Sequence, residues 1–146
     1  MALTDEQKMM VTDSFAKVAP IADKAAELFY GRLFEIDPGT KPLFKKTDMK
    51  EQGRKLMQTL ATAVGALYSL EQLVPVVEDL GKRHISYGVT KKQYDSVGQA
   101  LIWTLEQGLG DDFTPEVRGA WVEVYGILAS VATSAYDDEE EASDAS

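Results

Sequence analysis

Hydrophobic residues recur along the chain at the three- and four-residue spacing of an α-helix. Two such stripes are Leu56, Leu60, Ala63, Val64 and Leu67, and Trp121, Val124, Tyr125, Leu128 and Val131. The sequence shows no sustained alternation of polar and apolar residues and no Asn-Gly or Asp-Gly hairpin turn, so β-strands are not expected. The pattern predicts an all-α protein of six or seven helices.

Helix-start signals supply the boundaries between these stripes. Capping boxes, in which a hydroxyl residue precedes a glutamine by three positions, begin at Thr4, Ser69 and Thr90. Further starts are marked by Thr114 with a proline after it, by Asp37 with Pro38, and by Asp48. The predicted helices cover residues 4–18, 21–36, 38–44, 48–67, 70–85, 91–108 and 115–136, with an interruption of 70–85 at Pro75.

The length of 146 residues suits one domain with a sizeable core. No apolar run approaches the roughly 20 residues that a membrane span needs, so no membrane association is expected. The polar start of the chain does not resemble a signal peptide, and the sequence contains no cysteine. We therefore expect a cytoplasmic protein without disulfides or thiolate metal sites.

The formal net charge of −9 argues against nucleic acid as a partner. Six acids and no base lie in residues 137–146, DDEEEASDAS. Such a block of like charge has nothing to bury, which predicts a folded domain over residues 1–136 and a disordered tail over 137–146. The tail could serve as an interaction segment or simply as a solvated terminus.

The only histidine, His84, lies in the stretch DLGKRHISYGV, on the apolar face that Val77 and Leu80 begin. One interpretation is a core histidine that is neutral because it is buried and that bonds a backbone carbonyl. The other is a site for a flat ligand, because Gly81 removes bulk one turn earlier and Lys82 and Arg83 supply two cations beside the apolar face.

A conventional metal site is not expected at this histidine, since carboxylates would have to supply every other ligand. Haem brings four nitrogens of its own and needs only one imidazole from the protein. With one histidine, the chain cannot supply two imidazoles to the same iron.

Long segments resemble single-domain bacterial globins related to the globin domains of flavohaemoglobins. They are LFYGRLFEIDPGTKPLF (28–44), EQGRKLMQTL (51–60), LEQLVPVVEDLGKRHISYGV (70–89), QYDSVGQALIWTLEQGLGDDFTPEV (93–117) and AWVEVYGILASV (120–131). The resemblance covers roughly residues 4–136, and Phe44 and His84 are its diagnostic pair. It implies a globin fold, with helices packed around a pocket for non-covalent haem b.

The resemblance also implies roles for individual residues. His84 would ligate the iron, Phe44 would pack against the porphyrin, and Leu56 would wall the pocket. Tyr30 and Gln52 would face a gas on the distal side. The other implied haem contacts are Lys55 and Arg83 at the propionates, and Leu80, Val89, Tyr94, Val97 and Leu128 around the ring.

Each distal and charged assignment has a structural alternative. Tyr30 could be an ordinary core aromatic, and Gln52 could be a solvated residue of a first helical turn. Lys55 and Arg83 could be surface charges with no part in the site.

The implied function is reversible binding of oxygen, and of nitric oxide or carbon monoxide, at a pentacoordinate iron. Donors aimed at a polarised gas contribute about 1.5–3 kcal/mol each, which predicts tight oxygen binding and slow release. Enzymatic nitric oxide dioxygenation with an external reductase is one alternative, and a sensor that acts through a protein partner is another. A globin fold without haem is a third. The protein could be a monomer or a homodimer.

The sequence departs from flavohaemoglobin globin domains at one position behind the proximal histidine. Tyr94 matches the tyrosine of their proximal network, but Tyr136 stands where we expect its glutamate, within a residue or so. Loss of that carboxylate should make the imidazole less electron-donating. No flavin or nicotinamide domain is recognisable in the chain, so we expect electrons to come from a separate reductase.

Overall fold

The computed structural model describes residues 3–86 and 89–145, without the side chains of Leu70, Ser86 and residues 135–145. Its helices are α1 (Asp5–Val18), α2 (Ala22–Ile36), α3 (Met49–Gly65), α4 (Leu70–Ser86), α5 (Gln93–Leu109) and α6 (Pro115–Ala145). Short 3₁₀ helices lie at η1 (Ala19–Ile21), η2 (Pro38–Phe44), η3 (Leu67–Ser69) and η4 (Gly110–Asp112). The all-α prediction is confirmed, and the described residues contain no strand.

Hydrogen bonds confirm the predicted helix starts at Thr4, Asp48, Thr90 and Thr114, whereas Asp37 makes no side-chain cap. At α1, the Gln7 amide donates to the Thr4 hydroxyl and the Thr4 amide donates to the Gln7 side chain, both at 3.0 Å. Thr90 and Gln93 form the same reciprocal pair at 2.8 and 3.3 Å, just before α5. These bonds satisfy backbone donors that have no partner within the helix.

Two predicted helix limits were wrong, and a third predicted segment has the expected limits but is a different kind of helix. Pro75 does not interrupt α4, which is continuous from Leu70 to Ser86, so neighbouring contacts offset the one backbone bond that the proline cannot make. Residues 38–44 form a 3₁₀ helix. The structure extends α6 beyond residue 136 to Ala145, through Glu and Ala residues that favour helix. The predicted disorder of residues 137–146 in solution stays a prediction.

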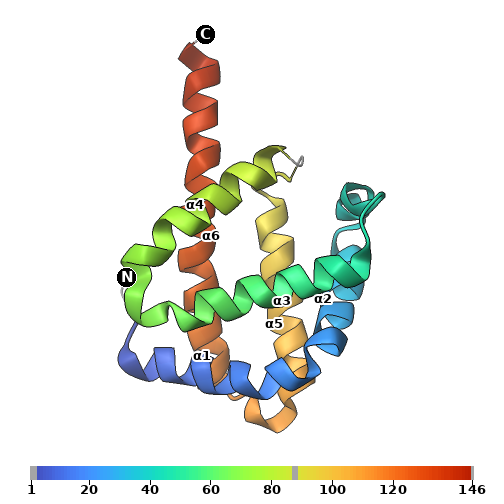
Figure 1. Ribbon diagram of the computed structural model, residues 1–146, viewed down its shortest axis with the longest axis vertical. Helices are drawn as coiled ribbons and strands as arrows, with labels where there is room; N and C mark the ends of the chain where they lie inside the picture. The colour runs from blue at the N-terminus through green and yellow to red at the C-terminus, as the bar shows by residue number, and fades with distance from the viewer. Residues whose placement is uncertain (1–2, 87–88, 146) are drawn as a thin grey trace.

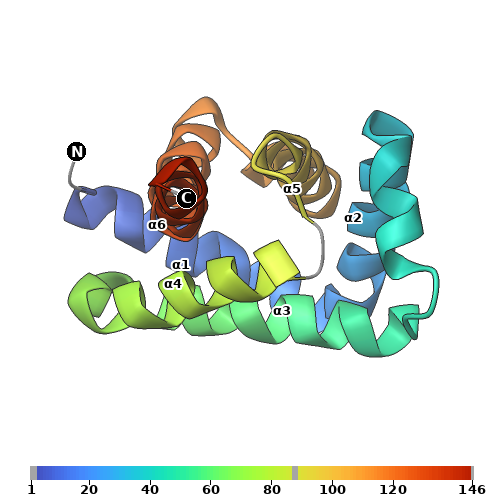
Figure 2. The same cartoon turned by 90° about the horizontal axis from the view of Figure 1, so that it is seen from above.

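Two helices, α5 and α6, lie side by side at the back of the molecule, and α3 and α4 form a V in front of them (Figures 1 and 2). In both views α5 and α6 are neighbours, with α2 flanking α5. In front of them, α3 and α4 meet at η3 and diverge towards their other ends, and α1 runs beneath (Figure 1). No helix in the described part of the chain is long and apolar enough to cross a membrane.

Buried apolar side chains form two separate clusters. The larger one joins α1, α2, α3, α5 and the start of α6, and its largest fully buried members are Trp121, Leu33, Leu67, Leu105 and Val11. At its centre the Trp121 indole N–H donates to the Ser14 hydroxyl at 2.8 Å. The smaller cluster holds Ala63, Leu73, Val77 and Ala132, and partly buried Leu128 packs against both clusters.

Gly81 is required by the contact between α4 and α6. A Cβ atom at this position would overlap the backbone carbonyl of Ala132 and lie 2.9 Å from its carbon. The sequence interpretation, that Gly81 makes room for a flat ligand, is therefore wrong. Its missing side chain lets two helix backbones approach each other.

Candidate functional site

The phenol of Tyr30 lies among aromatic rings on the inner side of α2. Tyr30 is 8% exposed, and its ring centroid is 4.9 Å from that of Phe29, 6.2 Å from Phe34 and 5.4 Å from Phe44. The pairs with Phe29 and Phe44 meet edge to face, an arrangement that stabilises aromatic pairs. This packing connects Phe44, at the end of η2, to Tyr30 and fixes the orientation of the tyrosine ring.

Gln52 reaches Tyr30 from the first turn of α3. The Asp48 carboxylate caps this helix by accepting the Lys50 amide at 3.0 Å, which sets where the turn begins. The Gln52 amide Nε2 then donates to the Tyr30 hydroxyl oxygen at 3.2 Å. Because a phenol has one proton, this contact uses a lone pair and leaves the O–H to donate elsewhere.

Burial keeps the Tyr30 phenol protonated. Desolvation raises the pKa of Tyr30 because it disfavours the phenolate, and the hydrogen bond from Gln52 offsets part of this rise. Among the described residues, no protein acceptor receives the Tyr30 O–H. The group is therefore a neutral donor in an aromatic setting.

His84 lies near the end of α4, with its ring oriented by its own helix. Its Nδ1 is 2.7 Å from the Leu80 carbonyl oxygen, and its ring stands 5.9 Å from that of Tyr94, edge to face. Burial lowers the pKa of His84, and the bond to Leu80 offsets part of this shift. In the neutral ring Nδ1–H donates to the carbonyl, which places the ring lone pair on Nε2, as a metal ligand requires.

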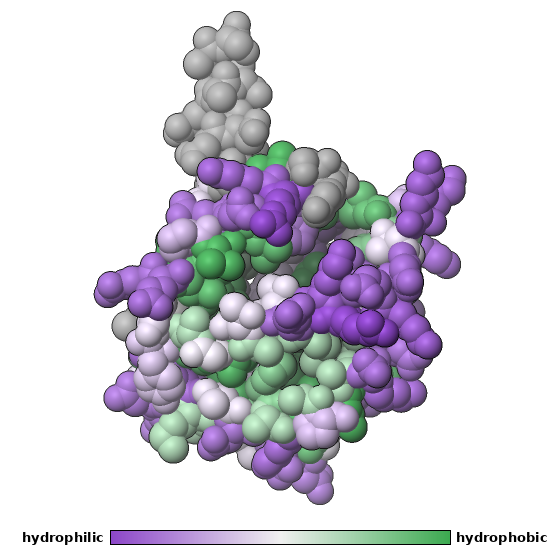
Figure 3. All heavy atoms as spheres, viewed as in Figure 1, coloured by the Kyte–Doolittle hydropathy of each residue, from purple (hydrophilic) through white to green (hydrophobic). Residues whose placement is uncertain are grey.

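The surface is hollowed between α3 and α4, with apolar residues around the hollow (Figure 3). The apolar residues predicted to contact haem are all only partly buried: Phe44, Leu56, Leu80, Val89, Tyr94, Val97 and Leu128. Of these, Phe44, Leu56, Val97 and Leu128 pack against the large cluster with part of their surface and leave the rest uncovered. Half-covered apolar side chains beside a neutral imidazole fit a flat apolar group such as haem.

The charged residues predicted at the propionates lie outside this apolar lining. Lys55 is exposed, and Arg83 forms an exposed ion pair with Asp79 of its own helix at 2.7 Å. Within the part of the chain that the structure describes, no group of three His, Cys, Asp or Glu side chains could hold a metal. An imidazole alone is sufficient where the cofactor brings its own nitrogens.

A small apolar cavity lies beside Leu56 and Phe29, the residue that packs on Tyr30. It is lined by Phe15, Val18, Ala25, Phe29, Leu56, Met57, Leu60, Leu101, Thr104 and Leu105. The Thr104 hydroxyl donates to the Ala100 carbonyl at 2.8 Å, so the one polar lining residue has its own partner. The cavity is therefore apolar, with no free polar group to hold an ordered water.

Sequence reasoning missed two contacts that hold the start of α5. The Tyr125 hydroxyl donates to the Tyr94 carbonyl at 2.6 Å, and the Ser96 hydroxyl donates to the Asp37 carboxylate at 2.9 Å. In the sequence, the only hint of the Tyr125 contact is Gly98. The structure shows why a glycine is needed there, because a Cβ atom would lie 2.8 Å from the Tyr125 ring. The side chain of Tyr136, predicted to replace a glutamate, lies outside the described residues.

Comparison with known proteins agrees with this geometry. The family model described as Globin matches residues 27–132, which span both Tyr30 and His84. The chain belongs to the globin family. This globin is 33% identical to a flavohemoprotein of Rhizobium meliloti over 95% of its length, and 31% identical to one of Bacillus subtilis over 69%. It is also 27% identical to neuroglobin of Danio rerio, over 90% of this chain and 91% of that protein.

The coverage of these relatives differs. The matches span 36% and 26% of the two flavohemoproteins, whereas neuroglobin is matched over nearly its whole length. The shared unit is thus the globin domain, and the predicted relation to flavohaemoglobin globin domains is confirmed. Family membership and the half-covered apolar residues identify a haem-binding globin with diatomic gases as its class of ligand.

Proposed function

We propose that this globin binds haem b through His84 and binds oxygen reversibly and tightly on the side of Tyr30. The observation that carries the proposal is the bond from the Gln52 amide to the Tyr30 oxygen. It turns the phenol into a directed donor, because the lone pair is used and the proton is not. His84 would hold the iron of haem, and the bound haem would supply the chemistry of reversible gas binding.

The rest of the proposed site supports this division of roles. His84 is neutral and holds its ring by the Leu80 carbonyl, as an axial ligand needs. Phe44 packs on Tyr30, with the two ring centroids 5.4 Å apart, and its uncovered surface is free to contact the porphyrin. Lys55 is placed, by the family resemblance, to meet a cofactor carboxylate. The role of Arg83 there would require it to leave Asp79.

The size of the effect follows from hydrogen-bond energetics. A hydrogen bond to an acceptor with developed negative charge contributes about 1.5–3 kcal/mol, and about 1.4 kcal/mol is a factor of ten in an equilibrium. The Tyr30 donor alone should therefore slow oxygen release by about ten- to a hundredfold. Carbon monoxide is less polar when bound and should gain less.

Replacement of Tyr30 by phenylalanine tests the proposal. It removes the hydroxyl and keeps the ring that packs on Phe29 and Phe44. We expect the oxygen dissociation rate, measured by stopped flow, to rise at least about tenfold, with a smaller change for carbon monoxide. Tyr68→Phe is the matched control, since Tyr68 is 59% exposed on η3. If the oxygen dissociation rate of Tyr30→Phe were unchanged, Tyr30 would not be the hydrogen-bond donor to bound oxygen.

Nitric oxide consumption is a second candidate, favoured by the similarity to two flavohemoproteins. It would require repeated re-reduction by an electron donor in the cytoplasm. The test is catalytic loss of nitric oxide by the oxygenated protein with a reducing system, compared with the same protein without it. A single stoichiometric loss in both cases would restrict the function to binding.

A further inference from the structure

Positive charge is concentrated in one segment of this acidic protein. Residues 41–55 hold six of the 15 Lys and Arg residues and only two of the 24 Asp and Glu residues. The segment is thus net positive by four charges, while the remainder of the chain carries nine bases and 22 acids. We name the six cations the basic corner: Lys41, Lys45, Lys46, Lys50, Arg54 and Lys55.

The charges of the basic corner are exposed and largely unneutralised. All six side chains are exposed. Arg54 pairs with Glu51 at 3.6 Å, and none of the five lysines has an ion pair with any described residue. Unpaired like charges repel one another, so their proximity lowers stability slightly unless a partner of opposite charge is met.

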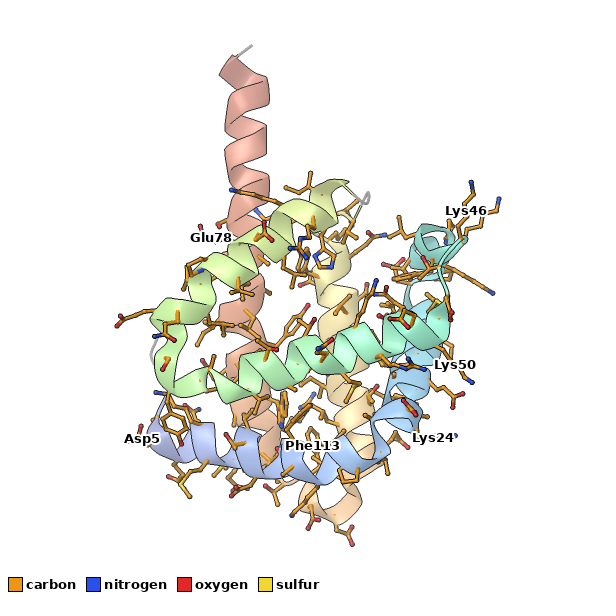
Figure 4. The ribbon with its side chains drawn as sticks, viewed as in Figure 1. Asp5, Lys24, Lys46, Lys50, Glu78 and Phe113 are labelled. Carbon is orange, nitrogen blue, oxygen red and sulfur yellow. The ribbon has the colours of Figure 1, made fainter. Side chains whose placement is uncertain are left out.

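The basic corner lies at the entrance of the haem-binding hollow. It includes the end of η2, where Phe44 lies, and the first turns of α3, where Gln52 lies. Figure 4 shows Lys46 and Lys50 at the end of α3 that diverges from α4, pointing away from the protein. A partner seated on these lysines would therefore lie beside the open end of the site.

We propose that the basic corner is the docking surface for an acidic electron-transfer protein that re-reduces the haem iron. The proposal rests on the proposed function, because only a globin whose iron becomes oxidised needs such a donor. In the step itself one electron passes from the reduced flavin or iron–sulfur centre of the donor to the ferric iron. The donor centre is oxidised by one electron, the iron becomes ferrous, and no covalent bond changes.

The charge distribution favours a compact acidic protein over an extended polyanion. The surplus outside the corner, 22 acids against nine bases, would repel a nucleic acid or an anionic membrane that spread beyond the patch. A small acidic protein can touch the corner alone. Complementary patches of this kind raise association rates by about ten- to a thousandfold at low salt.

The proposal is tested with the haem-loaded protein and an acidic flavodoxin as the probe. Lys45→Glu with Lys46→Glu reverses two charges of the basic corner without touching Tyr30, Gln52 or His84. We expect the second-order rate of ferric haem reduction, trapped with carbon monoxide, to fall at least about tenfold at low salt. The difference should vanish at about 0.5 M salt, where screening is strong. Calorimetric affinity for flavodoxin should fall in parallel.

Two controls separate docking from other effects. Lys8→Glu with Arg118→Glu makes the same change in net charge in α1, where Lys8 lies over the Tyr68 ring at the far end of α3, and at the start of α6, and should alter the rate less than about twofold. Photoreduced riboflavin, a small donor with at most one negative charge, should reduce all three proteins at nearly the same rate. An equal loss in both charge-reversal proteins, or no loss in either, would overturn the docking surface.

The outcome also separates this inference from the proposed function. If the protein retained no haem, the proposed function would fail, while calorimetry with flavodoxin would still decide whether the basic corner binds it. If phosphatidylserine vesicles bound through Lys45 and Lys46 and flavodoxin did not, the proposal of an electron-transfer protein would be wrong.

Discussion

The two sides of the proposed haem site, that of Tyr30 and that of His84, are held in place by different kinds of contact. The distal tyrosine belongs to the large cluster, where Phe29, Phe34 and Phe44 surround it and a residue 22 positions away bonds its oxygen. The proximal histidine is oriented by a carbonyl four residues earlier in its own helix. The side of Tyr30 is therefore pre-organised by tertiary packing, whereas the His84 ring is oriented by its bond to Leu80 of α4 and by its edge-to-face contact with Tyr94 of α5.

The position of α4 depends mainly on its packing against α6. Its buried described side chains are Leu73 and Val77, and Gly81 sits directly against the backbone of α6. An i−4 hydrogen bond fixes the His84 ring relative to α4 but not relative to Tyr30. The distance across the site thus depends on how α4 docks, which haem itself would strengthen by binding the folded form.

The largest expected effect is on the free energy of unfolding, and it comes from the large cluster. Trp121→Ala removes the central ring of the large cluster and leaves a cavity, so the free energy of unfolding should fall by about 3–5 kcal/mol. Chemical denaturation of the apoprotein measures it. Trp103→Ala is the control, since Trp103 is half-buried and its ring stacks with Arg32 at 5.1 Å. If both variants lost the same free energy of unfolding, the large cluster would not be the main source of stability.

A smaller effect is expected from Gly81→Ala, which acts on the proximal side alone. The added methyl must push α4 away from Ala132, at a cost of about 1–3 kcal/mol in the haem-loaded protein. We also expect faster haem loss to an apoglobin acceptor and little change in apoprotein stability. Gly126→Ala, where nothing lies within 4 Å, should be neutral or slightly stabilising. Unchanged haem loss in Gly81→Ala would show that this contact does not position His84.

On the distal side, Gln52→Leu should have an effect below that of Tyr30→Phe. It keeps the phenol donor and removes the amide that orients it, so we expect the oxygen dissociation rate to rise by about three- to tenfold. Gln58→Leu, an exposed position on the same helix, should leave the rate unchanged. A rise as large as that of Tyr30→Phe would mean that the amide itself contacts the gas.

The smallest expected effect is an absence of pH dependence. Burial raises the pKa of Tyr30 above its ordinary value near 10, so the donating phenol persists above the pH at which an exposed tyrosine ionises. The oxygen dissociation rate should stay constant from about pH 7 to 9.5. A marked rise within this range would show that the phenol loses its proton more easily than its burial implies.

Periodicity and caps were sufficient to predict the helices, because both are local. The reciprocal bonds of Thr4 with Gln7 and of Thr90 with Gln93 depend on residues three positions apart. The continuity of α4 through Pro75 depends on tertiary packing that local rules do not contain.

For the candidate site, too, local sequence rules were not sufficient. His84 could be singled out because it is the only histidine, but its bond to Leu80 fits a core residue and an axial ligand equally well. The resemblance was needed to choose between them. Gly81 was misinterpreted because a glycine in sequence does not show whether a ligand or a backbone approaches it, and only the position of Ala132 decides this.

Neither tryptophan of the chain lies in α4; Trp121 is buried in the large cluster, and Trp103 of α5 stacks with Arg32 of α2. Intrinsic fluorescence of the apoprotein therefore reports on the large cluster and is insensitive to detachment of α4. Far-ultraviolet circular dichroism counts helical residues in both parts. If α4 detaches first on heating, the two signals will change at different temperatures, and a single melting temperature will not describe the apoprotein.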